Sequence, residues 1–142
     1  MLWYDRYRWL FFGAAAATAI AGILHIILVP ISLNFNPMVG IFFLISGIVQ
    51  LFWAYPTVRR WGIIWYYVGI GGTILLIILW AIARLPSIIS EAVPLDVRDV
   101  SIVFFQIIYV GTATIIVSKR GGSQYDASQA NRYMPIGGGE EL

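Results

Sequence analysis

Long apolar segments, separated by charged and turn-forming residues, dominate this chain. The 50 residues between Arg8 and Arg59 include no Asp, Glu, Lys or Arg. A membrane-spanning helix needs about 20 mostly apolar residues, so this run is long enough for two. The two prolines and two asparagines at residues 30–37 favour a turn between them. The pattern predicts four spanning helices, at about residues 9–29, 38–55, 61–83 and 100–118.

The segments between the predicted spans differ in character. We expect residues 30–37 to form a short uncharged turn. We expect Pro56 to end the second span, so that residues 56–60 form a tight link between antiparallel neighbours. Residues 85–99 mix apolar and acidic side chains, which predicts a loop in the membrane interface with a helical turn beginning at Pro94.

Basic residues indicate the orientation of these helices, because cytoplasmic segments of membrane proteins are enriched in Lys and Arg. Only Arg84 and Arg98 fall on one side of the predicted bundle. Seven fall on the other side: Arg6, Arg8, Arg59, Arg60, Lys119, Arg120 and Arg132. The sequence therefore predicts an all-α protein, a four-transmembrane-helix antiparallel bundle in the cell membrane with both termini cytoplasmic.

The chain divides into two regions of different composition. Residues 1–118 form the predicted transmembrane domain, and residues 119–142 form a polar, Gly-rich cytoplasmic tail that ends GGGEEL. Segments rich in Gly, Ser, Gln and Asn are typically flexible. We expect this tail to lie along the surface of a partner on the cytoplasmic side.

Composition and charge exclude several classes of function. Apolar residues make up 60% of the chain and charged residues 11%, against about 45–50% and about 25% in soluble domains. The absence of cysteine excludes disulfides, thiolate metal sites and thiol nucleophiles. A net charge of +2, with the bases scattered in pairs, argues against nucleic-acid binding. No catalytic motif or cofactor-binding motif is present, so we predict neither.

Small residues recur at helical spacing and predict where the helices pack. Helices associate in lipid by close approach at Gly and Ala and by polar contacts. The predicted packing positions are Gly13, Ala17 and Ala21 in the first span, Gly40 and Gly47 in the second, and Gly62 and Gly69 in the third. Such stripes pack against one another or against another protein, and the pattern does not distinguish the two.

Three polar residues stand out within the predicted spans: His25, Gln50 and Gln106. Polar groups in a membrane are costly and are functional candidates by default. At 1.5 Å rise per residue, His25 and Gln106 lie about 6 Å and about 9 Å from the outer interface. One hypothesis joins them to the loop acids Glu91 and Asp96 as a metal site or proton relay. The other, which we favour, is that they form hydrogen bonds between helices while the acids are solvated.

Two groups of residues resemble those of a known class of protein. The first is His25, Pro37, Gly40-Ile41-Phe42-Phe43-Leu44 and Gln50, and the second is Trp80, Arg84-Leu85-Pro86, Glu91, Val93 and Asp96. Together they resemble small four-helix integral membrane proteins of unknown function from archaea and actinobacteria. The general build is also similar to small accessory subunits of archaeal ammonia monooxygenase. The resemblance implies the fold and no catalytic residue.

These observations lead to one main hypothesis. We expect a non-catalytic accessory or structural subunit of a larger membrane complex, an energy-metabolism oxidoreductase such as archaeal ammonia monooxygenase. Its partners are other integral membrane subunits and the lipid bilayer. The alternative is a stand-alone membrane protein that binds a metal ion or small solute at an outer-side polar cluster around His25.

Overall fold

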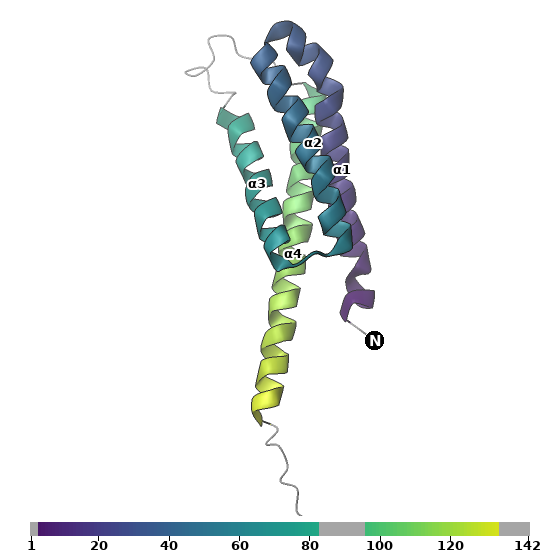
Figure 1. Ribbon diagram of the computed structural model, residues 1–142, viewed down its shortest axis with the longest axis vertical. Coiled ribbons are helices and arrows are strands. Elements are labelled where there is room, and N and C mark those ends of the chain that lie inside the picture. Colours follow the sequence, from purple (N-terminus) through teal and green to yellow (C-terminus); the bar gives the residue numbers. More distant parts are fainter. Residues whose placement is uncertain (1–2, 83–95, 134–142) are drawn as a thin grey trace, which may run out of the picture.

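The computed structural model describes residues 3–82 and 96–133. These residues form four helices that lie lengthwise beside one another, with α4 extending well beyond the rest (Figure 1). The helices are α1 (Trp3–Phe35), α2 (Pro37–Arg59), α3 (Ile63–Ile82) and α4 (Val97–Tyr133). Each has a segment long and apolar enough to cross a membrane. This confirms the prediction of an all-helical protein with four spanning-length helices.

The first connection is much shorter than the sequence predicts, because α1 continues through Pro30 to Phe35. Asn36 alone separates α1 from α2, and its side-chain oxygen accepts a hydrogen bond from the Met38 amide at 3.0 Å. Pro37 then occupies the first turn of α2, where its missing N–H has no cost. The predicted turn at residues 30–37 is therefore wrong. In an apolar solvent the backbone groups need internal partners, so a helix persists even across a proline.

The prediction that Pro56 ends the second span is also wrong, because α2 continues to Arg59 with Pro56 buried inside it. Arg60 then adopts the left-handed conformation, at φ 55° and ψ 46°, and its amide donates to the Pro56 carbonyl. Gly62 follows at φ 141°, a value that favours glycine. The tight link is therefore residues 60–62, and Gly62 serves the backbone turn rather than helix packing.

The fourth helix extends far past the predicted span, through Tyr133. The expectation of a flexible tail from residue 119 is therefore wrong for residues 119–133. Residues such as Ala, Gln and Arg in this segment support a helix, and glycines 121 and 122 alone do not end it. The predicted interfacial turn at Pro94 lies outside the described residues.

Buried side chains of α4 recur at alternating spacings of three and four residues, the pattern of helices packed along a common seam. These residues are Asp99, Ile102, Gln106, Tyr109, Ala113 and Ile116. The helix α1 lies at the centre of the packing and contacts both α2 and α4 over long stretches, whereas α3 contacts chiefly α4. Positions 99 and 106 place polar side chains on the seam, so the interior is not purely apolar.

Some of the predicted packing glycines and alanines lie at helix contacts in the structure, and others do not. Within this chain Ala17 and Ala21 are buried, while Gly13 is exposed and a Cβ there would meet nothing within 4 Å. A Cβ on Gly47 would lie 2.9 Å from the Gly22 carbonyl oxygen, so α1 and α2 approach closely at this pair. Gly22 lies beside the predicted stripe of Gly13, Ala17 and Ala21 rather than on it. Gly40 and Gly69 are also packing positions, facing the side chains of Leu33 in one case and Trp53 and Tyr109 in the other.

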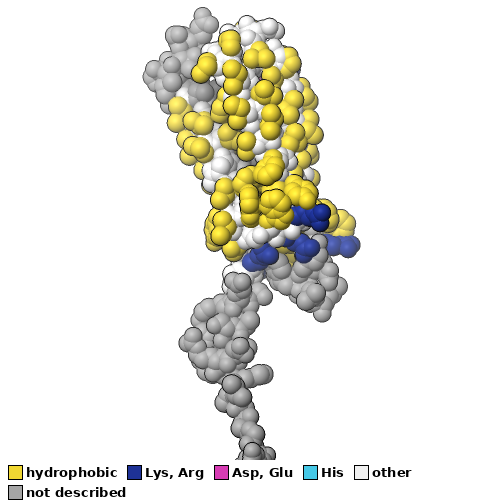
Figure 2. Space-filling view, viewed as in Figure 1, with side chains coloured by type: hydrophobic (Ala, Val, Ile, Leu, Met, Phe, Trp, Pro, Cys, Tyr) yellow, Lys and Arg dark blue, Asp and Glu magenta, His cyan; other side chains and the backbone are white. Residues whose placement is uncertain are grey.

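Lys and Arg side chains gather at one end of the bundle, below the apolar surface (Figure 2). We call this the basic end, and define it by Arg8, Arg59, Arg60, Lys119 and Arg120. The turn between α1 and α2 lies at the other end. The start of α4, with Asp96, Arg98 and Asp99, also lies at that opposite end.

Candidate functional site

A row of buried polar side chains follows the interfaces of α1 with α2 and α4. Such groups are rare inside membrane proteins and mark candidate sites. Among the described residues they include Thr18 and His25 on α1, Gln50 on α2, and Asp99 and Gln106 on α4. Gln50 and Gln106 each lie well inside their helices, whereas Asp99 is two residues from the start of α4.

His25 is deeper in the bundle than the sequence predicts. Because α1 extends to Phe35, His25 lies ten residues from the end of its helix, or about 15 Å rather than about 6 Å. Gln106 lies nine residues after Val97, or about 14 Å from the start of α4. The His25 side chain is 3% exposed. Its ring meets the Phe43 ring edge-on, with the centroids 5.5 Å apart.

The contacts between α1 and α2 fix how His25 and Gln50 face each other. Thr18 Oγ1 donates a hydrogen bond to the Gln50 carbonyl oxygen at 3.3 Å. Two turns further along α1, the His25 ring meets Phe43, which precedes Gln50 by two turns. These contacts run in opposite order along the two helices. Side chains tilt toward the N-terminus of their own helix, so those of His25 and Gln50 converge across the interface.

Asp99 is the acid that α4 contributes to this region. It is 8% exposed, and its charge acts on the His25 imidazole. Asp99 falls within the loop predicted at residues 85–99, so the sequence pattern did not identify it as a buried residue. Positions 99, 102 and 106 are separated by three and then four residues. This spacing could have identified Asp99 as a position on the packing seam of α4. Gln106 lies on the same seam but is not among the groups found to act on the imidazole.

The metal hypothesis gains no support from the described residues. Asp96 Oδ2 pairs with Arg98 Nε at 3.0 Å near the surface of the bundle, and Glu91 lies outside the described ranges. Within residues 3–82 and 96–133, no three His, Asp or Glu side chains come together as a metal site requires. Among the described residues, the structure therefore brings no predicted acid into a metal site with His25 and Gln106.

A second group of polar contacts, near the basic end, attaches α3 to the bundle. Trp53 Nε1 donates to the Trp65 carbonyl at 3.2 Å, and Tyr66 Oη donates to the Thr57 carbonyl at 2.9 Å. The Tyr66 hydroxyl supplies a hydrogen bond to the Thr57 carbonyl in the last turn of α2, because no later turn of that helix supplies an amide. The sequence pattern does not predict these contacts, because each joins a side chain of one helix to a backbone carbonyl of another.

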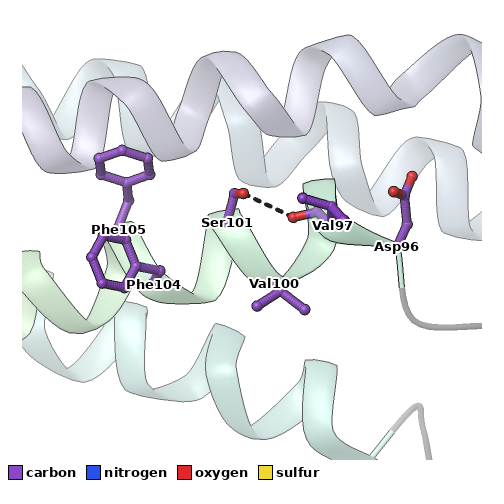
Figure 3. Close-up of a pocket in the computed structure, with 6 residues that line it drawn as sticks. All are labelled: Asp96, Val97, Val100, Ser101, Phe104 and Phe105. Atoms are coloured by element: carbon purple, nitrogen blue, oxygen red, sulfur yellow. Dashed lines mark hydrogen bonds between the residues drawn. The ribbon is translucent and has the colours of Figure 1, made fainter.

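Beyond this attachment, α3 packs little against the rest of the chain. Its buried residues are Tyr66, Gly69 and Thr73, and none from Ile74 to Ile82 is buried. The start of α4 is correspondingly open and borders a cleft of about 440 Å³. The cleft is lined by Asp96, which precedes α4, and by five residues of α4 (Figure 3): Val97, Val100, Ser101, Phe104 and Phe105. Its lining changes from polar at Asp96 to aromatic at Phe104 and Phe105.

The structure thus has two distinctive features, a buried polar set and an open apolar cleft. The polar set consists of His25, Gln50 and Asp99, and the cleft borders the first turns of α4. In the comparisons with known proteins, no family model, curated protein or solved structure matches this chain. Its function is therefore argued from these residues.

Proposed function

We propose that this chain is a non-catalytic integral membrane subunit that acts by packing against other membrane subunits of a larger complex. In this proposal its four helices cross the cell membrane as an antiparallel bundle, with both termini on the cytoplasmic side. The basic end supports that orientation, since Lys and Arg concentrate in cytoplasmic segments. Two of its bases lie over aromatic rings, Arg8 over Trp9 at 5.1 Å and Arg59 over Tyr55 at 5.6 Å.

The observation that carries the proposal is the open cleft bordered by the start of α4. A four-helix bundle that is complete by itself buries one face of every helix along its length. Here α3 has no buried residue after Thr73, and the facing start of α4 leaves Val100 and Phe104 exposed. A transmembrane helix of a partner subunit fits beside this mostly apolar surface. Packing in lipid needs such shape complementarity, because lipid tails are as apolar as the helix surfaces.

The extension of α4 offers a second surface for partners. From Gly121 to Tyr133 the helix continues for twelve residues beyond the spanning segment, or about 18 Å. In the proposed orientation this segment enters the cytoplasm. The resemblance noted from the sequence makes an energy-metabolism oxidoreductase such as archaeal ammonia monooxygenase the complex that we propose.

Site-specific photocrosslinking in the native membrane tests this proposal. A photoreactive phenylalanine analogue replaces Phe104, which is 58% exposed beside the cleft. The matched control replaces Phe12, which is 50% exposed on α1. We expect a protein adduct of one defined mass at position 104 and lipid adducts at position 12. Lipid adducts alone at both positions, with a chain that purifies as a single species in mild detergent, would contradict the proposal.

A further inference from the structure

One nitrogen of the His25 imidazole is already engaged, and the other is available. Nδ1 lies 2.9 Å from the Ala21 carbonyl oxygen. A carbonyl can only accept a hydrogen bond, so Nδ1 carries the hydrogen and donates it. In the neutral ring, Nε2 therefore holds an unprotonated lone pair. The contact with Ala21, one turn earlier on the same helix, also fixes the orientation of the ring.

The side chain of Gln50 presents an acceptor on the α2 side of this ring. Gln50 is 4% exposed, and among the described residues its Oε1 has no hydrogen-bond partner. A buried acceptor without a partner is unfavourable. The converging tilts of the two side chains bring this amide toward the imidazole, and the amide is among the groups that act on the ring. Protonation of Nε2 supplies the missing donor.

Burial disfavours the charged form of the imidazole, and the charged group that opposes this effect from α4 is the Asp99 carboxylate. From α1 the ring meets the Ala21 carbonyl, and from α2 it meets Phe43 and Gln50, none of which is charged. In the described part of the chain α3 meets α1 through the rings of Tyr66 and Phe11, whose centroids are 6.2 Å apart, and Phe11 lies fourteen residues before His25. Asp99 also lies two residues from the start of α4, so it connects the site to the end of the bundle opposite the basic end.

We infer that His25, Gln50 and Asp99 form an intramembrane proton-binding site. A hydronium ion from the aqueous side nearest Asp99 transfers one proton to Nε2 and leaves water. The new Nε2–H donates to Gln50 Oε1, and the Asp99 carboxylate balances the charge. The surroundings favour a proton over a larger ligand, because the ring packs against Phe43 and a Cβ on Gly47 would lie 3.2 Å from the His25 Cβ. This inference does not depend on the proposed subunit role.

His25 is the single histidine of the chain, so nitrogen NMR reports on this site alone. We propose to label the imidazole with ¹⁵N in the full chain in lipid nanodiscs, and to titrate from about pH 4 to about pH 9. We expect Nδ1 to remain protonated throughout and Nε2 to gain one proton within this range. An Nε2 that never takes up a proton would overturn the inference, as would a neutral form with the hydrogen on Nε2.

Variants separate the roles of the neighbouring groups. At the pH where half of wild-type His25 is protonated, Asp99→Asn should lower the protonated fraction to about a tenth, the effect of a tenfold change in the equilibrium. Gln106→Leu, at another buried polar position of the same seam, should leave it at half. An unchanged protonated fraction of His25 in Asp99→Asn would refute the role of Asp99 as the counter-charge. If that variant does not fold, the wild-type titration still decides whether the site binds a proton.

Discussion

Gly69 offers the sharpest test of how α3 is attached to the bundle. Substitution by alanine adds a Cβ that would collide with Tyr109 Oη and Trp53 Nε1, and would lie 2.8 Å from Trp53 Cδ1. Both partners are large side chains in a packed region, so neither can move away freely. Trp53 would also lose its hydrogen bond to the Trp65 carbonyl. We therefore expect Gly69→Ala to loosen α3 at its attachment to α2 and α4.

The expected magnitude follows from three opposing effects. Overpacking a filled site costs about 2 kcal/mol, and loss of the Trp53 hydrogen bond costs about 1 kcal/mol. Replacement of a glycine inside a helix recovers about 1 kcal/mol. The net destabilisation of the bundle should be about 2 kcal/mol. Gly71, two residues further along α3, is the matched control because a Cβ there would meet nothing within 4 Å, so Gly71→Ala should be neutral or slightly stabilising.

Unfolding in mixed micelles of a mild detergent and SDS, followed by tryptophan fluorescence, measures this difference. Trp53 and Trp65 report on it directly, since their ring centroids are 5.3 Å apart at the attachment. Tyr109→Phe in the Gly69→Ala background should recover part of the loss, because it removes one of the two colliding groups. Equal stability of Gly69→Ala and Gly71→Ala would refute the packing described here.

Three further predictions concern the ends of α2 and the orientation of the bundle. Arg60→Gly should stabilise the fold by about 1 kcal/mol, because glycine adopts the left-handed conformation without a Cβ penalty; a lower unfolding midpoint in the same micelle assay would contradict this. Tyr66→Phe should destabilise it by about 1 kcal/mol by removing the hydrogen bond to the Thr57 carbonyl, and an unchanged midpoint would show that the bond does not contribute. In this cysteine-free chain, a membrane-impermeant maleimide applied to intact cells should label Arg98→Cys and not Arg59→Cys; the reverse would invert the proposed orientation.

The helices were more predictable from the sequence than their ends. Composition and the spacing of charges identify four apolar segments, because spanning a membrane requires length and hydropathy alone. Pro30 and Pro56 were interpreted as boundaries by rules that hold in water, where a broken helix can bond to solvent. Inside lipid that alternative is missing. Both helices therefore continue past their prolines, to Phe35 and Arg59.

The candidate site was predictable only in part, because its members come from three helices. The sequence identifies His25 and Gln50 as polar residues within apolar runs, but it does not show that they converge. Their meeting depends on the register of α1 against α2, which the close approach of Gly22 and Gly47 determines. Asp99 falls at the end of the loop predicted at residues 85–99, whereas in the structure it is a buried residue of α4.

The sequence by itself determined that this chain has four apolar helices long enough to cross a membrane. Those properties are local, since they depend on composition and length. The tertiary structure decided which face of each helix is buried, and so which polar residues meet. It also decided that α3 is attached by Tyr66 and Gly69 and leaves a cleft beside the start of α4. Such features depend on the shapes of side chains distant in sequence, which hydropathy patterns do not record.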